Sequence, residues 1–279
     1  MKVTKFPAYP CVMGIVNITP DSFYATSRVQ EETALRARVR QIVREGGSMV
    51  DVGAYSTRPG AAEVSADEEM SRLSWALPII TSELESQCVR HVVPVSVDTY
   101  RAQVAERCVT EFDADVINDI SGGTLDEAMF DVVRRTHAHY ILMHMRGTPQ
   151  DMQQHCDYPM GVTREVIRFF ARQLEALGTT EGVILDPGYG FAKTLEQNYE
   201  LMQGIDAMKQ AFSQCPLLVG ISRKSMIYRL LGADADQALN GTTVLNTYAA
   251  LHGADILRVH DVREAVETLR IVEMLRQNA

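Results

Sequence analysis

Eight short runs of apolar residues, most of them rich in Val, Ile and Leu, recur from one end of the chain to the other. Nearly continuous apolar runs are typical of strands that are covered on both faces, as in a parallel sheet, whereas half-exposed strands alternate apolar and polar residues. The number of runs and their even distribution therefore favour one large parallel sheet. The runs span residues 12–19, 49–54, 92–98, 115–121, 140–145, 182–188, 217–222 and 255–261.

The segments between these runs show helical spacing. In residues 31–43, for example, Leu35, Val39 and Ile42 follow one another at intervals of four and three, which places them on one helix face, and a glycine pair then ends the segment. Eight strand-helix units in about 250 residues predict a (β/α)8 barrel. No linker or low-complexity tract divides the chain, so a single domain over residues 1–279 is expected. A doubly wound sheet is the alternative fold.

Charge and composition restrict the partners. The chain has 36 Asp and Glu against 27 Lys and Arg, a formal net charge of -9, which argues against a broad contact with nucleic acid or an anionic membrane. Any anion site must therefore be built locally. The N-terminus has no apolar signal-peptide core, and no apolar run reaches roughly 18 residues, so a cytoplasmic protein is expected. The five cysteines are scattered without a CxxC pair and are expected to be thiols of the core.

The C-terminal ends of the eight runs are mostly polar or ionisable. In a (β/α)8 barrel, the loops after these strand ends carry the active site. The pattern therefore favours an enzyme whose site lies at the barrel mouth. In chain order, the ends carry Asn17, Thr57, Arg58, Pro59, Asp98, Asn118, Asp119, Met143, His144, Asp186, Arg223, Lys224, Arg258 and His260.

Two of these ends, at Asp98 and Asp186, place a carboxylate directly after an apolar run. With Asn118 between them in the chain, they could accept hydrogen bonds from a flat, donor-rich heterocycle such as an aminopyrimidinone. The alternative is that Asp98 caps the helix that follows it, because Asp is a common N-cap residue. His144, which lies in an apolar run, is interpreted as a histidine of the core.

Other ends indicate an anion. Arg223 and Lys224 stand at the expected start of a helix, where acids are usual, so an anion or an electron-rich ring is expected there, with a solvated charge pair as the alternative. Arg258 and His260 are two residues apart on a strand and share one face, which suggests a common anion such as phosphate. Asn17 could offer its carbonyl oxygen to Mg²⁺, or be an ordinary turn residue. The residues alone predict a barrel enzyme that acts on a heterocycle and a phosphorylated, Mg-bound group.

Longer motifs surround these residues, in the order of the strands. They are MGIVNITPDSF at 13–23, DVG and STRPGA within 51–61, SVDT at 96–99, INDISGG at 117–123, LMHMRGTP at 142–149, LDPGYGF at 185–191, GISRKS at 220–225 and RVHDV at 258–262. Together they resemble the dihydropteroate synthase family. The resemblance covers all eight strand ends, so chance does not explain it.

The resemblance implies a transferase of folate biosynthesis and a target of sulfonamides. Members of this family are (β/α)8 barrels, usually homodimers, that condense 6-hydroxymethyl-7,8-dihydropterin diphosphate with 4-aminobenzoate to give 7,8-dihydropteroate and diphosphate. Mg²⁺ is the implied cofactor. The implied mechanism is dissociative: Mg²⁺ and the anion-binding residues help diphosphate to leave, and the amine then attacks a cationic methylene.

The resemblance also assigns roles to individual residues, with Arg258 stacking on the pterin ring and Asp186 pairing with its 2-amino group and ring N–H. The pterin is bound by Asp98, Asn118, Met143, Asp186, Lys224 and Arg258. The diphosphate is bound by Asn17, Arg58, Arg258 and His260, and Asn17 also reaches Mg²⁺. The aminobenzoate is bound by Thr57, Pro59, Phe191 and Ser225.

Two loops depart from the family pattern. Ala54 and Tyr55 precede STRPG where Gly-Glu is usual, and the first loop reads DSFYATSR where many members continue DSF with Ser-Asp-Gly-Gly. Tyr55 and Tyr24 add aromatic bulk that could change loop movement. No insertion accompanies Pro59 and Gly60, so sensitivity to sulfonamides is expected.

Two rival functions stay open. One is a non-catalytic paralogue that binds pterin, and the other is a methyltransferase that acts between methyltetrahydrofolate and a corrinoid protein. The STRPG and SRKS motifs and the pair of Arg258 and His260 disfavour the methyltransferase, which has no diphosphate to bind.

Overall fold

Eight parallel strands close into a barrel. Their order is β6-β5-β4-β3-β2-β1-β8-β7, and a parallel bridge between Leu185 and Leu217 joins β6 to β7. The predicted (β/α)8 barrel is therefore confirmed, and the doubly wound alternative is wrong because an open sheet has two free edges. The computed structural model describes residues 3, 5–18, 28–55 and 64–277. The strands are β1 (Cys11–Asn17), β2 (Met49–Gly53), β3 (Val95–Asp98), β4 (Val116–Asp119), β5 (His139–Met143), β6 (Val183–Asp186), β7 (Leu218–Val219) and β8 (Ile256–Val259).

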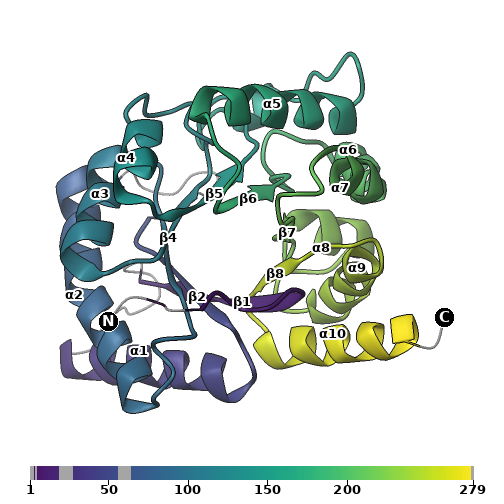
Figure 1. The fold of residues 1–279 in the computed structure, drawn as a ribbon. Coiled ribbons are helices and arrows are strands. Elements are labelled where there is room, and N and C mark those ends of the chain that lie inside the picture. Colours follow the sequence, from purple (N-terminus) through teal and green to yellow (C-terminus); the bar gives the residue numbers. More distant parts are fainter. Residues whose placement is uncertain (1–2, 4, 19–27, 56–63, 278–279) are drawn as a thin grey trace.

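Helices surround the barrel as an outer layer (Figure 1). The predicted apolar face of the first helix is confirmed, because Leu35, Val39 and Ile42 are fully buried. The helix ends at Arg44, and the N–H of Gly47 then donates to the carbonyl of Ile42 at 2.8 Å. The helices are α1 (Arg28–Arg44), α2 (Ala66–Ser86), α3 (Ala102–Phe112), α4 (Met129–Thr136), the 3-10 helix η2 (Met152–Gln154), α5 (Val162–Leu177), α6 (Leu195–Gln203), α7 (Ile205–Ala211), α8 (Ser225–Leu231), α9 (Leu239–Leu251) and α10 (Val262–Gln277).

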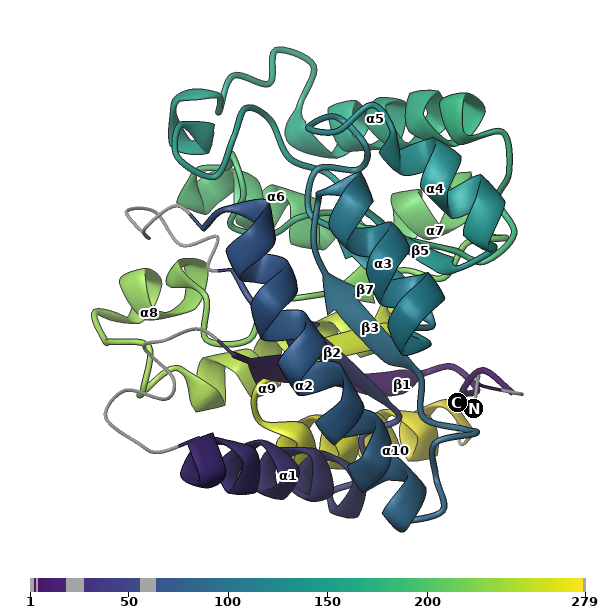
Figure 2. The ribbon, with the colours of Figure 1, turned by 90° about the vertical axis from the view of Figure 1, so that its left-hand side faces the viewer.

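Apolar side chains fill the N-terminal half of the barrel. Phe6 packs against them and stacks on His139, the first residue of β5, with 4.0 Å between ring centroids. Figure 2 shows helix α8 at the opposite end, toward which the strands run. A ligand therefore reaches the interior from the C-terminal ends of the strands. The filling residues are Cys11, Met13, Met49, Val116, Ile141, Ile184, Leu218 and Ile256.

The cysteines only partly follow the prediction of core thiols. Cys11, Cys108 and Cys215 are buried, Cys156 is half-buried, and Cys88 is exposed. The prediction is wrong for Cys88 because this residue follows the end of α2, where the backbone turns with a φ of 58°. None of the helices in the described part of the chain has the length and apolar character that a membrane crossing requires.

Candidate active site

Polar side chains take over the barrel interior near the C-terminal ends of the strands. Asp51 lies two residues beyond the core residue Met49 on β2 and so continues its inward-facing row. Asn118 on β4, Asp186 on β6 and Arg258 on β8 continue the rows of their own strands in the same way. The interior thus changes from apolar to ionisable partway along the barrel.

Arg258 binds two carboxylates at once. Its Nε donates to Oδ2 of Asp51 at 2.7 Å, and its Nη2 donates to Oδ2 of Asp98 at 2.8 Å. Burial by itself lowers the pKa of the guanidinium, but Asp51 and Asp98 outweigh this effect, so the pKa is raised. The two contacts fix the guanidinium plane, and the side chain remains 20% exposed, so a ligand can still reach it.

Asp51 is the central residue that the sequence analysis did not assign. Its side chain is fully buried, and its Oδ2 also accepts from Nδ2 of Asn118 at 3.1 Å. One carboxylate therefore orients both an amide and a guanidinium. The signal in the sequence was an acid at an inward position inside an otherwise apolar strand, where a charge is rare without a partner.

Asp98 belongs to the pocket and does not cap a helix. The N-cap of α3 is Arg101, and the carboxylate at this end is that of Asp126, whose Oδ2 accepts from the N–H of Ala102 at 2.8 Å, so the capping alternative is wrong. Burial raises the pKa of Asp98 to about 7; Arg258 opposes this shift and Asp51 adds to it. A carboxyl with this pKa is partly protonated at neutral pH.

Asp186 and Lys224 form a second polar group at the mouth. Oδ1 of Asp186 accepts from the N–H of Gly188 at 2.8 Å, and burial raises the pKa of this carboxyl against the opposing charge of Lys224. Nζ of Lys224 donates to the carbonyl of Tyr189 at 2.5 Å and lies 4.7 Å from the ring centroid of Phe191. Burial lowers the pKa of Lys224 to about 8, with Asp186 opposing the shift.

An apolar wall stands beside these polar groups. Met143 belongs to a buried cluster with Ile120 and Ala192, against which Phe191 packs. The inward position after Asp51 on β2 is a glycine, Gly53, where a Cβ atom would come within 3.5 Å of the Cβ of Asp98. An apolar wall beside a few convergent polar groups is the composition of a small-ligand site.

A buried lysine holds the segment that carries Phe191. Nζ of Lys193 donates to the carbonyls of Gly188 and Phe191, both at 2.9 Å, and lies 3.0 Å from Nδ1 of His144. Burial lowers the pKa of both Lys193 and His144 well below their ordinary values. The interpretation of His144 as a core residue is confirmed, whereas Lys193 was missed because its acceptors are mainly backbone atoms.

The ends of β1 and β8 form the other side of the mouth. Asn17 and His260 both line a cavity of about 300 Å³. Arg38 of α1, which sequence reasoning also missed, donates to the carbonyl of Ile15 at 3.2 Å and to that of His260 at 2.7 Å. It therefore ties the two strand ends together. The predicted residues Thr57, Arg58 and Pro59 lie outside the described residues.

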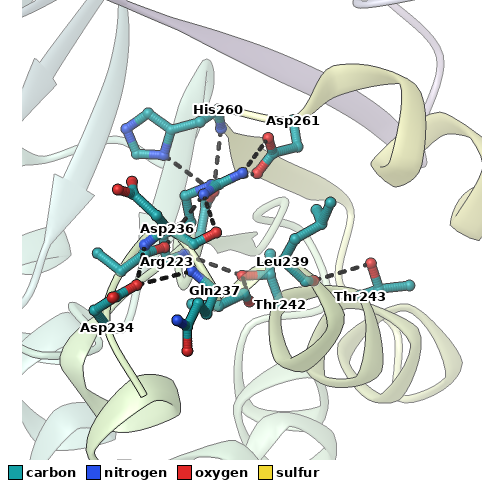
Figure 3. Close-up of polar contacts among 12 residues, drawn as sticks. Arg223, Asp234, Asp236, Gln237, Leu239, Thr242, Thr243, His260 and Asp261 are labelled. Carbon is teal, nitrogen blue, oxygen red and sulfur yellow. Dashed lines mark hydrogen bonds and ion pairs between the residues drawn. The ribbon is translucent and has the colours of Figure 1, made fainter.

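Arg223 pairs with an acid of its own chain, and the expectation that it meets a ligand anion is wrong. Its Nε and Nη2 donate to the two oxygens of Asp261 at 2.8 and 2.9 Å (Figure 3). Lys224, the next residue, is the cation that lies in the pocket. Ser225 follows as the half-buried first residue of α8.

A (β/α)8 barrel with buried carboxylates, an amide and two cations at its mouth defines an enzyme for a small, donor-rich ligand. The chain belongs to the pterin-binding enzyme family, whose model matches residues 13–260, and within that family to the dihydropteroate synthases. The resemblance inferred from the motifs is thereby confirmed.

Three known dihydropteroate synthases are similar to this chain over nearly their whole length. Dihydropteroate synthase of Escherichia coli strain K12 is 38% identical over 270 residues, which cover 95% of this chain and 92% of that protein. The Yersinia pestis dihydropteroate synthase in a sulfonamide drug complex has a TM-score of 0.84 at 36% identity, covering 96% of this chain and 95% of that chain. The Anaplasma phagocytophilum enzyme with bound 6-hydroxymethylpterin-monophosphate has a TM-score of 0.82 at 31% identity, covering 95% and 98%.

Proposed function

We propose that this chain condenses 6-hydroxymethyl-7,8-dihydropterin diphosphate with 4-aminobenzoate to give 7,8-dihydropteroate and diphosphate. The observation that carries the proposal is the network in which Asp51 orients Asn118 and Arg258 beside Asp98. This network presents hydrogen-bond acceptors and a cation to a ligand, and the chain belongs to the pterin-binding enzyme family. A methyltransferase that acts on methyltetrahydrofolate has no diphosphate to bind, so it would not need Asn17 and His260 at the ends of β1 and β8.

The pterin ring would lie between the apolar wall at Met143 and the guanidinium of Arg258. The carboxylate of Asp186 would accept from the 2-amino group and a ring N–H, which are charge-assisted hydrogen bonds. Asn118 can both donate and accept, so it suits a ring edge that carries both kinds of group. Asp98 and Lys224 complete the polar rim of this pocket.

Diphosphate would be bound by Asn17, Arg258 and His260. Oγ of Ser222 accepts from the backbone N–H of His260 at 3.1 Å and lies 3.0 Å from its Nδ1. The serine proton is thus placed to be donated to Nδ1. In that tautomer Nε2 carries the imidazole proton and is a donor for a phosphate oxygen.

Mg²⁺ would be held by the amide oxygen of Asn17 together with phosphate oxygens and water. This donor set fits the ion, which prefers oxygen ligands and is usually bound through few protein groups and substrate phosphates. In the described part of the chain, no group of three or more His, Cys, Asp or Glu side chains could hold a metal, so a site completed by the substrate suits these residues. The bound ion would neutralise charge on the departing diphosphate.

The reaction would begin with the departure of diphosphate. The cationic methylene that remains is conjugated with the pterin ring, and the carboxylates of Asp98 and Asp186 are already in place to stabilise its charge. An arylamine is a nucleophile at neutral pH, so a strong general base is unnecessary. Phe191 and Ser225 would bind the aminobenzoate together with Thr57 and Pro59, and Arg58 would join the diphosphate-binding residues. Thr57, Arg58 and Pro59 lie outside the described residues.

Two copies of the chain would associate through α8, α9 and α10, which lie side by side at one edge of the barrel (Figure 1). These helices expose large apolar side chains, and a gathering of this kind is typical of a protein interface. The cytoplasm is the proposed location, since the cysteines of the described residues are free thiols. The exposed apolar residues are Leu230, Leu231, Val244, Leu251, Ile271, Met274 and Leu275.

The test is diphosphate release from the purified protein supplied with the pterin diphosphate and Mg²⁺, with and without 4-aminobenzoate. Turnover should require the amine and fall by about a hundredfold or more in Lys224→Ala. The matched control is Lys209→Ala, which removes a lysine paired with Asp255 at the start of β8, at the other end of the barrel. If the protein binds pterin but releases no diphosphate, it is the non-catalytic paralogue.

A further inference from the structure

The pairing of β1 with β8 stops before the residues that line the cavity at this side of the mouth. In the register of the two strands, the last pair is Gly14 with Val259. Ile15 and His260 come next, and Asn17 lies two residues further along β1. Asn17 and His260 both line the cavity. The pairing between these two strands therefore does not set the separation of the two residues.

Arg38 joins the strands beyond the end of their pairing. Its Nε donates to the carbonyl of Ile15 at 3.2 Å, and its Nη2 donates to the carbonyl of His260 at 2.7 Å. These two carbonyls belong to the residues that would form the next pair of the register. The guanidinium is planar and its N–H groups point in fixed directions, so one side chain holds both carbonyls in a set relation.

Helix α1 holds Arg38 firmly at this place. Nη1 of Arg38 donates to Oε1 of Gln41 at 3.3 Å, and Nε2 of Gln41 donates to Glu45 at 2.9 Å. One turn beyond Arg38, Ile42 lies so close to β1 that a Cβ atom on Gly14 would come within 2.7 Å of its Cγ1 atom. The helix is therefore seated directly against one of the two strands that Arg38 contacts.

Arg38 differs from the other arginines of its helix. Arg36 and Arg40 form ion pairs with Glu83 of the neighbouring helix α2. The side-chain contacts of Arg38 go instead to two carbonyls and an amide, and the side chain lines the cavity beside Asn17. Arg38 therefore connects the helix to the mouth of the barrel, whereas Arg36 and Arg40 connect it to the next helix.

We infer that Arg38 is a positioning residue for the leaving group: it sets the spacing of Asn17 and His260, and through them the binding of diphosphate. A group bound by both residues is sensitive to their spacing, because a hydrogen bond weakens when its donor and acceptor are displaced. This inference deepens the proposed function and rests on it for the identity of the ligand.

The pterin side of the site does not depend on Arg38 in this way. Arg258 lies two residues before the end of β8 at which Arg38 binds, and it has its own contacts with Asp51 and Asp98. Loss of Arg38 leaves both of these contacts in place. Its removal should therefore weaken binding of the phosphates and spare binding of the pterin ring.

The test compares two ligands in the presence of Mg²⁺ and without 4-aminobenzoate: 6-hydroxymethylpterin and 6-hydroxymethylpterin diphosphate. The ratio of their affinities, measured by titration calorimetry, is the phosphate gain. In Arg38→Met, which keeps an unbranched side chain but removes the N–H groups, the phosphate gain should fall by about tenfold or more, as is usual when a group that orients a binding residue is lost. The affinity for 6-hydroxymethylpterin should stay at the wild-type value.

Arg38→Lys separates spacing from charge. Lysine keeps the positive charge, but its compact ammonium on a flexible stem does not hold two carbonyls in a fixed relation. The phosphate gain should therefore fall in Arg38→Lys nearly as far as in Arg38→Met. The matched control is Arg44→Met, which removes an exposed arginine from the last turn of the same helix and should keep the wild-type gain. If Arg38→Met does not fold, Arg38→Lys decides the question.

Four results overturn the inference. They are a wild-type phosphate gain of one, a folded Arg38→Met with the wild-type gain, an Arg38→Lys that restores the gain in full, and an equal loss of affinity for both ligands. The third would assign the effect to charge, and the fourth to general damage of the pocket. Turnover is measured separately. A wild type whose phosphate gain depends on Arg38, but which releases no diphosphate with the amine, would contradict the proposed function and leave this inference standing.

Discussion

Nε of Arg258 lies 2.7 Å from Oδ2 of Asp51, although the two residues are 207 positions apart in the chain. They meet because β1 pairs with both β2 and β8, which brings the second and last strands to either side of the first. This contact lies inside the barrel, between the apolar filling and the mouth. The geometry of the pocket depends on it, since Asp51 also holds Asn118.

Replacing Asp51 by Asn should destabilise the protein and weaken pterin binding together. The variant leaves Arg258 with one carboxylate, and breaking a buried ion pair costs about 3–5 kcal/mol. Denaturant unfolding and calorimetric titration with 6-hydroxymethylpterin measure the two effects. Asp67→Asn, an exposed change on α2, is the control. Wild-type affinity in Asp51→Asn would mean that Asp98 alone positions Arg258.

Pterin affinity should be greatest between pH 7 and 8. The pKa of Asp98 is raised from 3.8 to about 7, so below pH 7 a proton occupies the carboxyl that should accept from the ligand. The pKa of Lys224 is lowered from 10.5 to about 8, so above pH 8 its positive charge is lost. Affinity should therefore rise through pH 7 and decline above pH 8.

Titration calorimetry across pH 5.5 to 9, about the range that covers both groups, checks this profile. The titration of the free ligand is measured separately. Asp98→Asn should remove the acid side of the profile, and Lys224→Met the alkaline side. If the pterin affinity of Asp98→Asn still falls below pH 7 as in the wild type, the proton responsible belongs to another group.

Gly53→Ala should reduce ligand binding without unfolding the protein. The added methyl group would lie 3.5 Å from the Cβ of Asp98, an ordinary contact, and the φ of Gly53 is not in the left-handed region. The free energy of unfolding should therefore change by less than about 1 kcal/mol. Pterin affinity should fall by about tenfold or more because the methyl group fills ligand space. If Gly53→Ala binds pterin as tightly as the wild type does, the pterin ring does not lie beside Gly53.

Lys193→Met should impair sulfonamide binding as well as stability. The substitution leaves the carbonyls of Gly188 and Phe191 without their donor, at a cost of about 1–3 kcal/mol for each buried group. The segment that carries Phe191 should loosen, so the sulfonamide dissociation constant should rise while thermal unfolding shifts downward. A stability loss with unchanged sulfonamide affinity would limit Lys193 to a structural role.

Charges placed on the exposed apolar helices should separate the proposed dimer. Val244 on α9 and Ile271 on α10 are 58% and 62% exposed, so glutamate at either position should be tolerated by the fold. Light scattering after size-exclusion chromatography should show a dimer for the wild type and a monomer for the double variant. Met160→Glu, on the loop before α5, is the control. A monomeric wild type would contradict the proposed association.

The sequence allowed the barrel and the strand-end residues to be predicted because both follow from local patterns. Asp98 and Asn118 lie near the C-terminal ends of apolar strands, where a barrel opens its site. Asp51 could not be assigned because its role depends on Arg258, which only the closed barrel brings near. Arg223 was misread for the same reason: a local rule for helix starts predicted a ligand, whereas the partner is Asp261 on another strand end.

The pairing of β1 with β8 has a consequence for synthesis of the chain on the ribosome, where the N-terminal part emerges first. Asp51 and Asp98 are made early, but their cation, Arg258, belongs to the last strand. Until that strand emerges, the two acids must remain hydrated, because burying unpaired carboxylates is costly. Strand β8, the last to be made, therefore both closes the ring between β1 and β7 and brings the cation that the two acids require.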